Sequence, residues 1–182
     1  MTFDEAVKAG RIRVEEALAL FDSLPTVELA FLRGTWKGSE LQTGHPMDGM
    51  LGATGWYGKQ FIDAESVHPL LFFTEDRAAL FPVDPRKWPS PKLPGLVGPH
   101  RAEVETRKFK ARLRMTEYRG QLSATMLYDD WPTNDVFRKV DPDTVLGAMD
   151  ARGMATPYFF VLRRDAESPP LSVTGDPADR AR

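Results

Sequence analysis

Gly34-Thr35-Trp36-Lys37-Gly38 and Gly55-Trp56-Tyr57-Gly58 are the two most informative stretches of this chain. In each of them a tryptophan lies between glycines at the start of a segment with strand character. Glycine permits the positive φ angles and the close backbone approach that occur where a strand begins or bends. Tryptophan fills a large apolar space and carries an N–H that needs an acceptor. The two stretches therefore predict consecutive strands of a small closed β-barrel.

Segments with strand character continue through most of the chain. Charged and apolar residues alternate over 111–118, and the Arg119-Gly120 turn predicts a hairpin with 121–128. About nine or ten strands suffice for an antiparallel barrel. The expected strands are 29–41, 55–63, 67–74, 78–83, 103–109, 111–118, 121–128, 133–140, 144–149 (alternatively a helical turn) and 157–164.

Two helices are expected before the first strand. Thr2 and Glu5 have the spacing of a capping box, and Gly10 can end the short helix that follows. Apolar residues then recur at helical spacing over 14–21, until Pro25 ends the pattern. We expect these N-terminal helices to cover the barrel, either over its mouth or on its outer surface.

The chain is expected to form a single β-barrel domain over residues 1–164. Six prolines between positions 82 and 99 predict a long irregular loop, which either connects the halves 18–83 and 100–164 or contributes to function. The polar residues 165–182 show no periodicity, and this composition favours a disordered tail.

Bulk composition excludes several classes of protein. A formal net charge of −2 argues against a nucleic-acid partner, and the absence of cysteine excludes disulfides and thiolate chemistry. The acidic N-terminus does not resemble a secretory signal, and no apolar run approaches the roughly 20 residues that cross a bilayer. These features predict a soluble, cytoplasmic protein.

Residues 34–38 match the name-giving motif of the GXWXG-domain family, and residues 118–164 resemble that family's C-terminal companion domain of unknown function. The resemblance implies a calycin-like barrel similar to lipocalins and fatty-acid-binding proteins. In lipocalins the tryptophan of this motif packs against an arginine from the last strands. By analogy, Arg138 or Arg163 is the expected partner of Trp36.

The same resemblance implies a binding protein for a hydrophobic ligand such as a fatty acid or phospholipid, with no cofactor and no catalytic residue. Methionines and aromatic residues form adaptable apolar walls, although a solid core would use the same residues. Asp135 and Arg138 are expected to form an inward charged pair, near the hydroxyl of Tyr128. The expected ligand-binding residues are Trp36, His45, Trp56, Tyr57, Lys59, Phe61, Phe73, Met115, Met126, Tyr128, Asp135, Arg138 and Phe159.

Two other functions stay open at this stage. A haem-binding barrel resembling nitrobindin would need His45 or His100 as the axial ligand. A cofactor-free enzyme on an apolar substrate would use Asp135 or Asp48 as the base and Tyr128 or His45 as the acid. The histidines show no metal-ligand spacing, and no serine lies in a nucleophile elbow.

Basic residues are concentrated between positions 101 and 119, where acidic residues interrupt them. Such a cluster predicts either transient contact with an anionic membrane surface or an ordinary solvated strand face.

Overall fold

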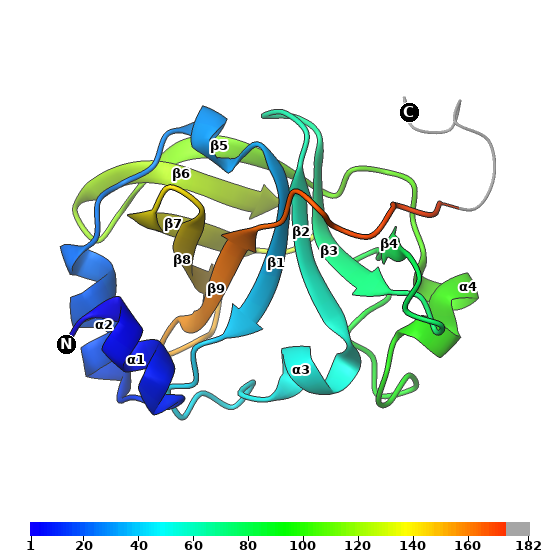
Figure 1. Cartoon of the computed structure of the whole chain (residues 1–182), viewed down its shortest axis with the longest axis horizontal. Coiled ribbons are helices and arrows are strands. Elements are labelled where there is room, and N and C mark those ends of the chain that lie inside the picture. The colour runs from blue at the N-terminus through cyan, green and yellow to red at the C-terminus, as the bar shows by residue number, and fades with distance from the viewer. Residues whose placement is uncertain (174–182) are drawn as a thin grey trace.

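An antiparallel β-barrel forms the body of the chain in the computed structural model, which describes residues 1–173 (Figure 1). The strands run in the order β2-β1-β9-β8-β7-β6-β5-β3-β4, and an additional pairing of β2 with β3 closes the ring. The predicted mainly β, barrel-like fold is confirmed. Within the described residues the strands are β1 (Gly34–Glu40), β2 (Trp56–Phe61), β3 (Val67–Phe73), β4 (Leu80–Pro82), β5 (Ala111–Tyr118), β6 (Gln121–Tyr128), β7 (Thr133–Asp141), β8 (Thr144–Ala151) and β9 (Tyr158–Arg164).

Side chains alternate between the inside and the outside of this barrel, as the pleat of a strand requires. In β9, Tyr158, Phe160 and Leu162 belong to the interior core, whereas Phe159 and Val161 belong to a second core outside the ring. Strands with apolar residues on both faces need a second covering layer.

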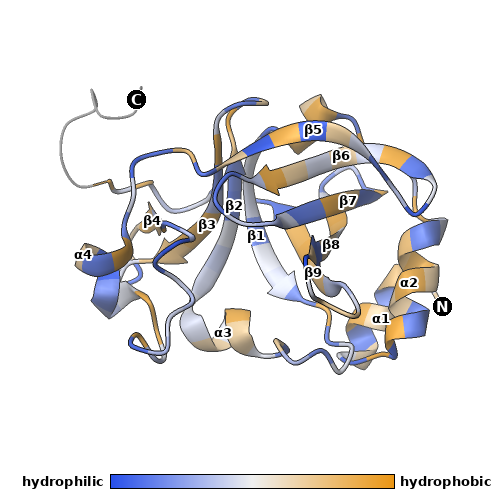
Figure 2. Ribbon diagram, turned by 180° about the vertical axis from the view of Figure 1, so that it is seen from behind, coloured by the Kyte–Doolittle hydropathy of each residue, from blue (hydrophilic) through white to orange (hydrophobic). Residues whose placement is uncertain are grey.

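Helices α1 (Phe3–Ala9) and α2 (Val14–Ser23) supply that layer (Figure 1). The predicted capping box of α1 is present, with Thr2 and Glu5 bonding each other's backbone N–H groups. Figure 2 shows hydrophobic and hydrophilic residues on both helices, and the buried residues of α2 pack with the outer side chains of β7, β8 and β9. The helices therefore cover the outer surface of the barrel rather than its mouth.

The segment from Pro25 to Val27 completes the barrel wall where β6 and β7 diverge. The amide of Val27 donates to Ser123 Oγ at 3.0 Å, and its carbonyl accepts from the amide of Ala124 at 2.8 Å. On the other side, the amide of Lys139 donates to the Pro25 carbonyl at 2.8 Å. The 3₁₀ helix η1 (Leu29–Leu32) then leads into β1.

Trp36 fills one end of the interior and is fully buried. Its indole N–H donates to the Leu32 carbonyl at 2.6 Å, and the Arg164 guanidinium lies 4.3 Å from the centre of its ring. Arg164 also donates to the carbonyls of Arg33 and Phe31, at 2.6 and 2.8 Å. The expected arginine partner therefore comes from the last strand, but it is Arg164 rather than Arg138 or Arg163.

Two segments differ from the sequence-based expectation. Residues 98–104 form the 3₁₀ helix η2 (Gly98–His100) and the short helix α4 (Arg101–Val104), so the strand predicted at 103–109 was wrong. An ion pair between Arg101 and Glu105, at 3.0 Å and helical spacing, supports this turn. A further helix, α3 (Met50–Thr54), lies between the first two strands, where no helix is expected from the sequence.

Part of the predicted disordered tail is ordered. The amide of Leu80 donates to the Pro170 carbonyl at 2.9 Å, and the amide of Ser172 donates to the Leu80 carbonyl at 2.8 Å, so residues 170–172 run beside β4. The rest of that tail, 174–182, lies outside the described residues. Over residues 1–173 we find no helix with both the length and the apolar character that spanning a bilayer requires.

Replacing Arg164 with methionine tests the Trp36–Arg164 contact. Arg164→Met removes the stacked cation and the hydrogen bonds to the Arg33 and Phe31 carbonyls and to the Asp143 carboxylate. We therefore expect the free energy of unfolding to fall by about 1–3 kcal/mol. Urea denaturation followed by tryptophan fluorescence measures it. Arg163→Met is the matched control on the exposed face of β9, and an equal loss in both variants would contradict the assignment.

Candidate functional site

The barrel encloses a cavity of about 310 Å³ between its open end and the interior core. Six aromatic residues and four methionines line it, and the methionine side chains are half-buried at its entrance. The aromatic lining residues are Trp56, Trp88, Tyr128, Trp131, Tyr158 and Phe160, and the methionines are Met47, Met50, Met149 and Met154.

Glycines on neighbouring strands create the space for two of these rings. A Cβ atom on Gly38 would lie 2.0 Å from the indole of Trp56, and one on Gly147 would lie 2.3 Å from the ring of Phe160. The last glycine of the first motif is therefore needed to place the tryptophan of the second motif against the cavity. Gly58, in turn, would bring a Cβ to 1.9 Å from the carbonyl oxygen of Trp36.

Substituting Gly38 tests this packing directly. In Gly38→Ala the new methyl group overlaps the Trp56 ring, so we expect a loss of stability of about 1–3 kcal/mol and a changed Trp56 emission. Chemical denaturation and fluorescence spectra measure both effects. Gly52→Ala is the control, because a Cβ there meets no atom within 4 Å. A Gly38→Ala protein as stable as the Gly52→Ala protein would refute the packing argument.

A buried ion pair lies in the cavity wall. Lys59 of β2 and Asp135 of β7 come from opposite sides of the barrel, and their charged atoms are 2.8 Å apart with side chains 3% and 1% exposed. Lys59 Nζ also donates to the Pro69 carbonyl at 3.0 Å and to the Tyr128 hydroxyl at 3.4 Å. Its ammonium faces the rings of Trp56, Tyr128 and Phe160 at 5.2–5.7 Å, which adds cation–π attraction.

Burial is the main cause of the raised pKa values of the acidic groups around this pair. It raises the pKa of Asp135 above its ordinary value, against the opposing attraction of Lys59. Burial also raises the pKa of Tyr128, and the Asp135 charge reinforces that shift, so the phenol keeps its proton. Likewise, burial and then the nearby Glu40 carboxylate raise the pKa of Tyr158.

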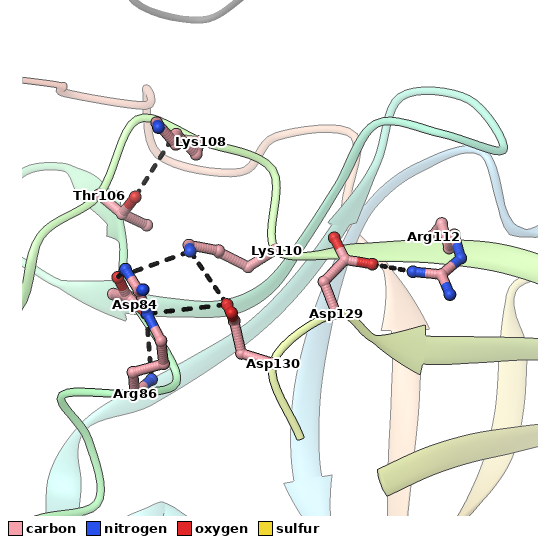
Figure 3. A network of polar contacts seen from close by, with 8 residues as sticks. All are labelled: Asp84, Arg86, Thr106, Lys108, Lys110, Arg112, Asp129 and Asp130. Carbon is pink, nitrogen blue, oxygen red and sulfur yellow. Dashed lines mark hydrogen bonds and ion pairs between the residues drawn. The ribbon is translucent and has the colours of Figure 1, made fainter. Parts of the chain in front are cut away.

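A second polar network fixes the long loop that brings Trp88 to the cavity (Figure 3). Asp84, at the start of the loop, binds the Arg86 guanidinium at 2.8 Å and lies 3.7 Å from Lys110 Nζ. Lys110 in turn pairs with Asp130 at 3.0 Å. This network joins the start of the proline-rich loop to Lys110, just before β5, and to the segment after β6. Because Trp88 and Pro89 of the loop line the cavity, the loop does more than connect two halves.

The Asp84 network predicts a pH-dependent contribution to stability. Burial acts to raise the pKa of Asp84, but hydrogen bonds from Arg86 and the charge of Lys110 outweigh it and hold that pKa below its ordinary value. Since the unfolded chain binds the proton more tightly, the contribution is present above the ordinary aspartate pKa and is lost as the pH falls through the lower folded value.

Asp84→Asn should therefore lower the free energy of unfolding by about 1–3 kcal/mol at pH 7 and by less at about pH 3. Urea denaturation at the two pH values measures the difference. Asp129→Asn is the control, because Asp129 pairs with Arg112 at the surface and should cost at most about 1 kcal/mol. An Asp84→Asn loss that stays constant with pH would contradict the network.

The structure brings four of the predicted ligand-binding residues to the cavity wall, namely Trp56, Lys59, Tyr128 and Asp135. The others lie elsewhere. Trp36, Phe61, Met115 and Met126 pack in the interior core away from the lining, whereas Tyr57 and Phe73 pack with each other on the outer face. Phe159 and Arg138 also face outward, beneath the helices.

The predicted pair of Asp135 and Arg138 was wrong. Residues three positions apart in a strand point to opposite faces, so only Asp135 reaches the interior. Arg138 is buried on the other side, 4.8 Å from the ring of Phe21, and donates to the Tyr118 carbonyl at 3.2 Å. The charge partner of Asp135 is Lys59. Lys59 follows Trp56 by three residues, and both reach the interior because the pairing of β2 with β3 is shifted between Trp56 and Gly58 and again between Gly58 and Gln60.

The histidines and Asp48 lie outside the set of lining residues. His45 packs against Tyr158 with tilted rings whose centroids are 5.4 Å apart, and it accepts from the Met47 amide, whereas His100 pairs with Glu103. Asp48 accepts from two backbone amides in the turn before α3. Of the residues considered for catalysis, the structure thus brings Asp135 and Tyr128 together around Lys59. No cluster of potential metal ligands occurs within residues 1–173.

The basic residues of positions 101–119 are largely engaged with acidic partners. They form the ion pairs Arg101–Glu105, Lys110–Asp130, Arg112–Asp129, Arg114–Glu65 and Arg119–Asp22. Charges that are already neutralised add little to membrane attraction, so the contact with a membrane surface stays a prediction.

Comparisons with known proteins match the chain to two family models. The model described as GXWXG protein matches residues 19–77, and the domain of unknown function DUF4334 matches residues 109–164. A crystal structure of a protein from Thermomonospora curvata is 34% identical, with a TM-score of 0.69. The match covers 89% of this chain and 95% of that protein. A comparison with curated proteins found no match.

Proposed function

Because this chain belongs to the GXWXG protein family, with the DUF4334 segment as the second part of its barrel, we propose that it binds a small hydrophobic ligand in the barrel cavity. The observation that carries the proposal is the cavity of about 310 Å³. Pockets for small molecules usually measure about 300–1,000 Å³ and combine apolar walls with a few polar groups. The barrel-like fold is compatible with a calycin-like binding protein.

The size of the cavity limits the ligand that can enter completely. At the lower end of the usual range, it suits one short chain or a compact ring system, whereas a phospholipid with two long chains would leave most of its apolar surface outside. The methionines at the entrance have flexible side chains that can adjust to different ligand shapes.

Burial of the ligand's apolar surface supplies the affinity. Each buried CH₂ contributes about 0.8 kcal/mol, so a chain of eight carbons gains about 6 kcal/mol before the entropic costs of association. The expected affinity for such a ligand is therefore modest. A more rigid ligand of the same volume should bind more tightly, because it loses less conformational freedom on binding.

Binding of the neutral fluorescent probe N-phenyl-1-naphthylamine tests the proposal. We expect saturable binding of one probe per chain with enhanced fluorescence, and loss of most of that binding in Met149→Trp, whose indole fills the entrance. Leu122→Trp is the control, since it adds the same ring at an exposed position of β6. If the wild-type protein leaves the probe fluorescence unchanged, or if Met149→Trp binds as well as Leu122→Trp, the proposal is wrong.

A further inference from the structure

The geometry of the Lys59–Asp135 pair points to the chemistry of the ligand's polar end: we propose that the cavity selects a neutral amphiphile with a hydroxyl group over a carboxylate or an ammonium of the same length. This inference rests on the proposed function, because it concerns the same cavity. Its basis is the set of hydrogen-bonding positions that Lys59, Asp135, Tyr128 and Trp56 leave unfilled.

Lys59 has no N–H left for a ligand. An ammonium group has three donors, and those of Lys59 point to Asp135, the Pro69 carbonyl and the Tyr128 hydroxyl. Its charge is balanced by Asp135 at 2.8 Å. A ligand carboxylate in the cavity would therefore lose its water without gaining a free cation, and it would approach the negative charge of Asp135.

The positions that stay open suit a hydroxyl group. Asp135 Oδ1 and Trp56 Nε1 are both buried, and neither has a hydrogen-bond partner among residues 1–173. Tyr128 accepts from Lys59, which leaves the phenolic hydrogen free to donate. The wall thus offers one charged acceptor beside aromatic donors. A hydroxyl can donate to the carboxylate and accept from a donor at the same time.

A cationic head group is disfavoured for a different reason. The aromatic faces that would attract a ligand cation, those of Trp56, Tyr128 and Phe160, already surround the Lys59 ammonium. A second cation there would be repelled by the first in surroundings of low dielectric constant. A neutral donor avoids this repulsion and the large cost of burying an unpaired charge.

Displacement of N-phenyl-1-naphthylamine at pH 7 by 1-octanol, octanoate and octylammonium tests which head group the cavity selects. The three compounds have the same alkyl chain and differ only in the head group. We expect 1-octanol to bind at least about tenfold more tightly than either ion. Octanoate binding as tightly as 1-octanol, or more tightly, would overturn the inference while leaving the proposed function intact. A protein that does not bind the probe refutes the proposed function itself.

Two sets of variants link the selection to the pair. Tyr128→Phe should lower the affinity for 1-octanol severalfold relative to the affinity for the probe, and Tyr57→Phe, on the outer face, should leave this ratio unchanged. Lys59→Met with Asp135→Leu replaces the ion pair by apolar side chains of similar size, which proteins often tolerate. In that double variant we expect the probe to bind and 1-octanol to lose severalfold in affinity relative to the probe, because its hydroxyl no longer meets the Asp135 carboxylate. An affinity for 1-octanol, relative to the probe, that is unchanged in the double variant would contradict the assignment of the polar site to this pair.

Discussion

The barrel depends on a reciprocal contact between β1 and β2, in which each glycine–tryptophan motif leaves room for the other. Gly38 lies against the indole of Trp56, and Gly58 lies against the backbone of Trp36. Side chains at either glycine would separate strands that must pair over residues 34–37 and 58–61. Because β2 also pairs with β3, this contact joins the two ends of the sheet into a ring. The enclosed cavity exists only if that ring is closed.

The two tryptophans have different tasks within this arrangement. Trp36 is a structural plug: Leu32 accepts its N–H, and Arg164 covers its ring. Trp56 belongs to the cavity wall, where its N–H has no acceptor in the described part of the chain. One residue type in two similar motifs thus serves stability in one place and ligand contact in the other. The buried Lys59–Asp135 pair beside Trp56 adds polar groups without net charge. Taking both charges out of water costs free energy of folding, so stability by itself does not explain the pair.

Sequence patterns were sufficient for most of the strands but not for the site. Alternation and turn residues predicted the hairpin of β5 and β6 and the barrel-like fold. The same alternation could have separated Asp135 from Arg138, since an odd spacing in a strand places two side chains on opposite faces. It could not identify Phe159 and Tyr57 as outward-facing, because helices or the C-terminal segment cover those outer positions and make both faces apolar.

The entrance of the cavity was beyond prediction for a different reason. Met47, Trp88, Trp131 and Met154 come from loops, where no periodicity relates a residue to the interior. Their convergence depends on contacts between segments that are distant in sequence, such as the link from Lys110 to Asp84 and Asp130. The composition of the proline-rich loop suggested irregular structure, but its position over the barrel follows from these contacts.

The ring of strands also has a consequence for how this architecture can be divided. The GXWXG match contains β1, β2 and β3, and the DUF4334 match contains β5 to β9. The two sets meet at two seams, β1 with β9 and β3 with β5. Each set alone would expose unpaired strand edges at both seams, which favours aggregation over independent folding. We therefore expect the two matched segments to fold as one unit, and exchanging one half between relatives would require both seams to be matched at once.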